Sequence, residues 1–183
     1  MRRRGFSLLL AASLAGCAAP TPRYYRLAAV PGATRGGDGR RIGVRNVGIP
    51  GDLDQNALAR PGSAYELNAY ANNLWAAPLA AMLQTVMVQN LAQRLPGDVV
   101  LQDGGAIGAM PDVYVEIQVL RIAPDASGNV TLEAQIGVRP VSAQAWKLQG
   151  FSATAPGGDT PEGLAASMSA LWGQAADVAA GLV

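Results

Sequence analysis

The residue best placed to do chemistry is Cys17, the only cysteine in this chain of 183 residues. It closes the tetrapeptide Leu14-Ala15-Gly16-Cys17, which follows a cluster of three arginines and an apolar run that starts at Phe6. A basic start, a short apolar stretch and a small-residue cleavage site are typical of a bacterial secretory signal. A cysteine directly after the small pair forms a lipobox, so the pattern predicts that the Cys17 thiol is acylated and the chain is cut before it.

Two other interpretations of this segment are a membrane-spanning helix and a plain secretory signal with an incidental cysteine. The apolar run is about nine residues, whereas a spanning helix needs about 20. The sole cysteine also stands at the one position that a lipobox requires. We therefore expect residues 1–16 to be the signal peptide, residues 17–22 a lipidated tether and residues 23–183 a single periplasmic domain.

The charge and the residue types exclude several kinds of function. Cleavage would leave 167 residues with 11 basic and 13 acidic side chains, and a near-neutral surface disfavours nucleic-acid binding. The chain has no histidine, so Ser-His-Asp and Cys-His catalysis are impossible. A zinc site needs histidine or cysteine ligands, and the only cysteine is the predicted lipidation site. The sequence predicts no cofactor and no metal site.

The remaining polar candidates lack a functional spacing. Asp52 and Asp54 do not continue into a calcium-binding EF-hand loop, and residues 104–108 lack the Lys-Ser/Thr ending of a phosphate-binding loop. Acidic residues could meet in space as a glycosidase-like pair, but their spacing does not favour it. Trp75, Trp146 and Trp172 are interpreted as core residues. Binding, anchoring or assembly is therefore the expected class of function.

Hydrophobic periodicity predicts the elements that would carry these functions. Apolar residues alternate within 112–122 and 129–138, and residues 125–128 between them fit a hairpin turn. Shorter strands are expected at residues 23–27, 64–70, 98–102 and 146–154, and at 42–49 with a bulge, while residues 50–60 are expected to be irregular.

Three-to-four spacing predicts two amphipathic helices. The first would begin at an Asn73 cap and end at Pro96, with Gln84, Gln89, Gln93 and Arg94 facing water. The second would begin at the Thr160 cap, followed by a proline in the first turn. The predicted fold class is α+β: a two-layer sandwich of a mostly antiparallel or mixed sheet of about five strands, covered by the two helices.

Several short motifs follow one another in a recognisable order. They are Tyr25-Arg26-Leu27 after the tether, Ile42-Gly43-Val44 before Val47 and Pro50, Leu53-Asp54 before Ala57-Leu58-Ala59-Arg60, and Trp75-Ala76-Ala77-Pro78-Leu79. In this order and spacing, the first two-thirds of the domain resembles the PqiC-type auxiliary lipoproteins of ABC-type intermembrane transport systems. Two departures are Gly51-Asp52, where an aromatic residue is expected before Leu53, and the Gly-rich segment 31–40. We expect the motif residues to have structural roles.

The resemblance implies a lipoprotein held by its acyl chains in the outer membrane and facing the periplasm. It would dock onto an MCE-type (mammalian cell entry) tunnel protein, whose inner-membrane permease and ATPase move lipid. The residue after Cys17 is Ala18, not the Asp of inner-membrane retention, which agrees with outer-membrane sorting. The family also suggests a ring-like homo-oligomer and no enzymatic activity.

Two alternatives remain open from the residues. One is another periplasmic lipoprotein that binds lipid directly or assists outer-membrane assembly, and a continuous apolar cavity would favour lipid binding. The other is a hydrolase, which would need a cleft with two acids about 5–10 Å apart.

Overall fold

The computed structural model describes residues 20–63 and 65–183, so the predicted signal peptide and Cys17 lie outside the described residues. In the described part the chain forms eight strands and two helices. They are β1 (Arg23–Tyr25), β2 (Arg41–Val44), β3 (Ala57–Arg60), β4 (Asn68–Trp75), α1 (Leu79–Arg94), β5 (Val99–Gln102), β6 (Val113–Pro124), β7 (Asn129–Pro140), β8 (Lys147–Pro156) and α2 (Pro161–Leu182). The predicted α+β class is confirmed.

A five-stranded mixed sheet with strand order β5-β2-β6-β7-β8 forms the main layer. β2 runs parallel to β5 and β6, whereas β6, β7 and β8 are antiparallel. The register places Val115 opposite Val138 and Ile117 opposite Ile136, and all four side chains are buried. The alternation in the sequence therefore predicted both the long strands and the face that they bury.

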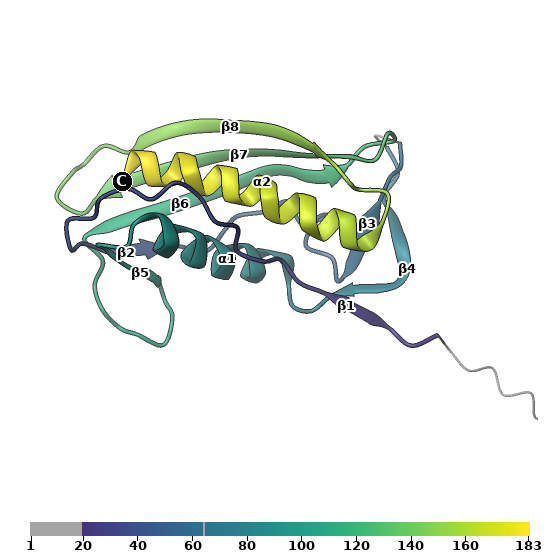
Figure 1. The fold of residues 1–183 in the computed structure, drawn as a ribbon, viewed down its shortest axis with the longest axis horizontal. Helices are drawn as coiled ribbons and strands as arrows, with labels where there is room; N and C mark the ends of the chain where they lie inside the picture. Colours follow the sequence, from purple (N-terminus) through teal and green to yellow (C-terminus); the bar gives the residue numbers. More distant parts are fainter. Residues whose placement is uncertain (1–19, 64) are drawn as a thin grey trace, which may run out of the picture.

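Both helices lie on one face of this sheet, side by side (Figure 1). Trp172 of α2 is 0 % exposed between the helices and the sheet, and its indole Nε1 donates a hydrogen bond to the Leu83 carbonyl of α1 at 2.9 Å. Thr160 caps α2 as predicted, because its side chain accepts a hydrogen bond from the Gly163 amide, and Pro161 is the first helical residue. The second layer thus follows from the helical periodicity.

A second sheet of three strands, in the order β1-β4-β3, was not predicted (Figure 1). Residues 50–60 are not wholly irregular, since they contain β3, and the strand expected at residues 64–70 begins only at Asn68 and continues to Trp75. β3 and β4 each bury one residue, Leu58 and Trp75, and their other positions are half-buried or exposed. With so few buried positions they show little apolar alternation, which is the signal that identifies a strand.

The predicted start of α1 is wrong. Asn73 and Trp75 belong to β4, and the cap position of the helix is Pro78. Proline disfavours helical backbone angles in the residue before it, so a helix cannot run smoothly through Ala77. The strand predicted at residues 42–49 is also shorter, because β2 ends at Val44.

Gln84 and Arg94 were expected to face water, but both are buried. The Gln84 side-chain amide donates to the Val44 carbonyl at 3.0 Å, which links α1 to β2. Arg94 is 1 % exposed. Its Nε donates to Asp177 Oδ1 at 2.6 Å and its Nη2 to the Gly173 carbonyl at 2.9 Å, both on α2.

The same guanidinium also binds the segment that crosses the helices after β1. Arg94 Nη1 donates to the Val30 carbonyl at 3.0 Å, and the Asn90 side chain accepts from the Val30 amide at 2.8 Å. Gly32 lies so close to Arg94 that a Cβ there would overlap the guanidinium. The buried arginine therefore joins three segments that are far apart in the sequence.

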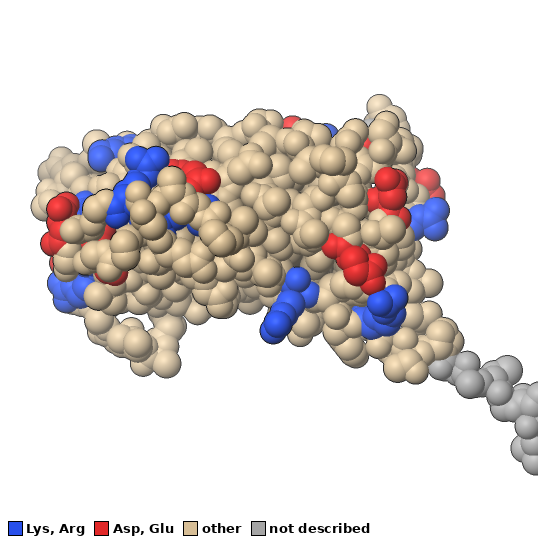
Figure 2. All heavy atoms as spheres, viewed as in Figure 1, with Lys and Arg blue, Asp and Glu red and all other residues tan. Residues whose placement is uncertain are grey.

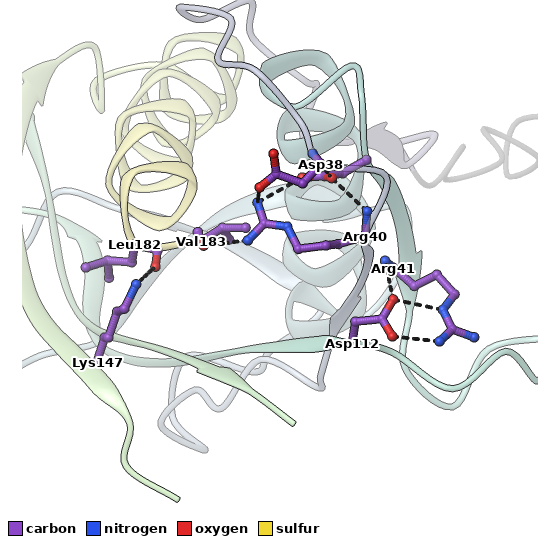
Figure 3. A network of polar contacts seen from close by, with 8 residues as sticks. Asp38, Arg40, Arg41, Asp112, Lys147, Leu182 and Val183 are labelled. Atoms are coloured by element: carbon purple, nitrogen blue, oxygen red, sulfur yellow. Dashed lines mark hydrogen bonds and ion pairs between the residues drawn. The ribbon is translucent and has the colours of Figure 1, made fainter. Parts of the chain in front are cut away.

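Cations from outside α2 bind its C-terminal end (Figure 3). The last turn of α2 contains no basic residue. Lys147 Nζ donates to the Leu182 carbonyl, and Arg40 Nη1 donates to a Val183 oxygen, each at 2.8 Å. Positive charge at this end of a helix offsets the partial negative charge of its free carbonyls.

Among the described residues, no helix combines the length and the apolar character needed to cross a membrane.

Candidate functional site

β3, β4, the end of β6 and the starts of both helices line a cavity at the end of the molecule where β1 lies, here called the β1 end. The cavity has a volume of about 160 Å³. Most of its wall is apolar, with a few polar groups at Asp52, Gln55 and Asn68. The large apolar side chains are Leu53, Leu67, Trp75, Leu79, Ile122, Leu164 and Met168. Such a lining suits a hydrocarbon group rather than a polar metabolite.

An outer groove of about 510 Å³ adjoins the cavity, and the two share Leu53, Leu67 and Asn68 in their walls. Its apolar rim is exposed: Leu67 is 60 % and Leu120 is 51 % exposed. The β6–β7 register shifts between Val119 and Arg121, and consecutive residues Leu120 and Arg121 are both exposed there. A bulge of this kind re-aims side chains, and here both side chains line the groove.

Charged groups of both signs line the outer groove. Arg60 and Arg121 are cationic, and Asp52 and Glu66 are anionic. Within residues 20–63 and 65–183, neither arginine takes part in an ion pair. The groove therefore offers cationic and anionic contacts beside an apolar cavity.

The structure brings several of the motif residues together at this end. Leu53, Trp75 and Leu79 line the cavity, and Pro50 and Arg60 line the outer groove. These positions lie far apart along the chain, so the sequence indicated the motif without indicating the cavity.

The other motif residues have structural positions. Tyr25 pairs with Trp75 across the β1–β4 ladder, Leu27 is buried in the core, and Pro78 caps α1. Asp54 is exposed and lines neither the cavity nor the outer groove. Cys17, the predicted lipidation site, lies outside the described residues.

Hydrogen bonds from tyrosines fasten the β1 end to the start of α2. Tyr25 Oη donates to Glu162 Oε1 at 3.1 Å, and Arg23 Nη2 pairs with the same oxygen at 2.8 Å. Partial burial and the bond to Glu162 raise the pKa of Tyr25. A bond from its own backbone amide lowers the pKa of Glu162, and the Tyr25 bond adds to this. Tyr70 Oη donates to the Gly158 carbonyl at 2.8 Å.

A second polar cluster lies on the face of the sheet that the helices leave open. Arg45 pairs with Glu116 and with Asp103, and its guanidinium stacks on Tyr114 at 4.2 Å from the ring centroid. Trp146 is only half-buried and was wrongly expected in the core. Its ring lies 5.1 Å from the Arg139 guanidinium. Each charge in the Arg45 group already has a partner, so the cluster is a satisfied surface network.

Charge is unevenly distributed over the helical side of the molecule. Figure 2 shows acidic and basic side chains gathered toward the two ends, with little charge over the middle of α2. Ala166 of α2 is exposed and lines a shallow groove with Ala28 and Val30, and the wall of this groove also includes Arg26 and Glu162. The cores of protein interfaces are depleted of charged residues, so the sparsely charged middle of α2 has the composition of a contact surface.

The described residues include no group of three or more His, Cys, Asp and Glu side chains placed to hold a metal ion. The carboxylates of Asp52 and Glu66 line one groove, and both residues are exposed. Both carboxylates are thus open to solvent at the outer groove.

A family model for the ABC-type transport auxiliary lipoprotein component matches residues 25–180. The chain belongs to this family. The predicted resemblance is therefore confirmed at the level of the family. As an ABC-type transport auxiliary lipoprotein, the protein is a transport-associated lipoprotein of the cell envelope, with partners in a transport system.

Solved structures resemble this auxiliary lipoprotein in fold. One is the crystal structure of an uncharacterized protein, with 22 % identity and a TM-score of 0.72, covering 88 % of this chain and 98 % of that chain. Another is a DUF330 protein from Xanthomonas campestris, with 18 % identity and a TM-score of 0.70, covering 88 % and 93 %. A search of curated proteins finds no match.

Proposed function

We propose that this lipoprotein is the outer-membrane docking subunit of an MCE-type system that moves lipid between membranes. Acyl chains on Cys17 would hold it on the periplasmic face of the outer membrane, and the folded domain would grip the tip of the tunnel protein. The observation that carries the proposal is the family match over residues 25–180. The lipobox, with Ala18 after the cysteine, supports the location.

The position of β1 agrees with such a role. Only residues 18–22 separate Cys17 from Arg23 at the start of β1, and five residues reach about 15–20 Å when extended. The β1 end would therefore lie near the bilayer. The opposite end, where α2 terminates, would point toward the periplasm (Figure 1).

The sparsely charged middle of α2 and the adjoining groove at Ala166 form the contact surface that we assign to docking or to assembly into a ring of identical subunits. Ala166 lies in this groove beside Ala28 and Ala165, with Arg26 and Glu162 in the same wall. A charged side chain there would have to be desolvated on contact, which is costly without a partner.

Docking fits this domain better than carriage of a whole lipid. The apolar cavity of about 160 Å³ is smaller than the roughly 300–1,000 Å³ of sites that enclose a complete small ligand. In this proposal the protein works by adhesion, without a catalytic step or a cofactor. Assistance in outer-membrane assembly is the main alternative.

The test is co-purification of the mature lipoprotein from cell envelopes under mild crosslinking. We expect an MCE-type protein to be recovered with the parent chain and with Ala92→Glu, an exposed control on α1. Recovery should fall with Ala166→Glu. Recovery of outer-membrane assembly factors without any MCE-type protein would contradict the proposal.

The anchor is tested separately. Cys17→Ser should leave the precursor uncut and should abolish labelling with radioactive palmitate, while Cys17 in the parent chain is labelled. Normal labelling of the variant would exclude Cys17 as the lipidation site.

A further inference from the structure

We infer that the β1 end holds one membrane phospholipid, with the end of an acyl chain in the apolar cavity and a zwitterionic head in the outer groove. This site goes beyond docking and rests on one part of the proposed function, the anchor at Cys17 that keeps the cavity beside a bilayer.

The cavity has the size and lining for the end of a hydrocarbon chain. An apolar cavity of roughly 150 Å³ in another protein stays dry and binds benzene, a six-carbon ligand. The cavity here is about 160 Å³, and Leu164 and Met168 of α2 line it together with Leu53 and Trp75. It therefore has room for the last several carbons of one chain, but not for a lipid.

The outer groove supplies the complementary part of the ligand. Arg60 and Arg121 have no ion-pair partner among the described residues, and guanidinium groups bind phosphate oxygens with paired hydrogen bonds. Asp52 and Glu66 line the same groove and suit an ammonium group. A phosphate and an ammonium on one head match this mixture of charges better than a purely anionic head does.

The bilayer is within reach of the cavity. Trp75 in the cavity wall pairs directly with Tyr25, and Cys17 precedes Tyr25 by eight residues. Eight residues span at most about 28 Å. Exposed Leu67 and Leu120 form the apolar rim that a chain would cross as it leaves the membrane.

The test reads the contact between Trp75 and an acyl chain by fluorescence. The mature lipidated chain is reconstituted in vesicles of phosphatidylethanolamine and phosphatidylglycerol, with bromine on the acyl chains of one lipid at a time. Trp146→Phe removes the half-exposed indole on the open sheet face, and Trp172 gives a constant background because it is fully buried. We expect quenching of Trp75, at lower mole fractions of brominated phosphatidylethanolamine than of brominated phosphatidylglycerol.

Two pairs of variants separate the cavity from the groove. Ala57→Leu fills the cavity from β3 and should abolish quenching, since each methylene kept out lowers affinity about fourfold. Ala92→Leu, exposed on α1, should leave quenching unchanged. The double change Arg60→Gln and Arg121→Gln should raise the half-quenching mole fraction by about three- to tenfold.

For the outer groove, Arg26→Gln is the matched control, because Arg26 is exposed and lines neither the cavity nor the outer groove. Equal quenching in the parent and in Ala57→Leu, or no quenching in the parent, would overturn the site. Equal half-quenching fractions for the two brominated lipids would overturn the zwitterionic head. Quenching only when bromine is placed on the acyl chains of Cys17 would show that the protein's own anchor is the occupant. The co-purification experiment does not depend on this site, so either proposal can fail alone.

Discussion

Replacement of Arg94 by methionine is the perturbation with the largest expected effect on stability. The guanidinium is 1 % exposed and donates to Asp177 and to the carbonyls of Val30, Asn90 and Gly173. Breaking a buried ion pair costs about 3–5 kcal/mol. The Asp177 side chain is 44 % exposed and water can solvate it again, so we expect the lower part of this range, about 3–4 kcal/mol.

The assay is urea and thermal unfolding of the mature chain. For a domain of this length each 1 kcal/mol lowers Tm by about 2–4 °C, so Arg94→Met should lower it by about 10 °C. Arg94→Lys keeps the charge but loses the planar fork, and should cost about half as much. Amide hydrogen exchange at Val30 should accelerate in both variants.

The control is Arg26→Met, a change at an exposed arginine that should stay within about 0.5 kcal/mol of the parent. If Arg94→Met were as stable as this control, the view that Arg94 joins α1, α2 and the segment at Val30 would be wrong.

Three further changes test local interactions. Hydrogen bonds from Arg41 lower the pKa of Asp112 to about 2. The ionised Asp112 therefore stabilises the fold above the unfolded-state pKa, and this stabilisation is lost as the pH falls from about 4 to 2. Asp112→Asn should flatten the profile of urea midpoint against pH in that window. Thr160→Ala removes the cap on the Gly163 amide and should cost about 1 kcal/mol in urea unfolding, with Thr160→Ser close to the parent. Lys147→Met should cost about 0.3–1 kcal/mol by the same assay, and a loss that does not shrink in high salt would contradict an electrostatic origin.

The periodicity of apolar residues predicted those strands that bury one face of the main sheet against the helices. Val115 and Ile136 alternate with polar neighbours, and both were placed correctly in the main sheet. The start of α2 was predictable because Thr160 and Pro161 form a local signal.

The remaining elements depend on contacts between distant residues. Arg94 resembles a solvated residue in its local sequence, and it is buried because Asp177 lies 83 positions further along the chain. Trp75 fits a helical pattern as well as a strand, and its pairing with Tyr25 decides for β4. Patterns within one segment carry no information about such partners.

The candidate site was predictable only in part. The motif containing Leu53, Trp75 and Leu79 was identified, but the cavity between these residues exists only after β3 and β4 pair and the two helices converge. Arg121 gave no signal in the sequence, because its exposure beside the outer groove follows from the shift in the β6–β7 register.

The parallel pairing of β1 with β4 has a mechanical consequence for a tethered protein. Any pull along the tether arrives first at Arg23, and it acts along the length of β1. Because the bonds to β4 lie across that direction, they would be loaded together in shear instead of opening one after another. The pair between Arg23 and Glu162 shares the same force and passes it to the longest helix of the described chain. The domain could thus bear tension between two membranes before its core is disturbed.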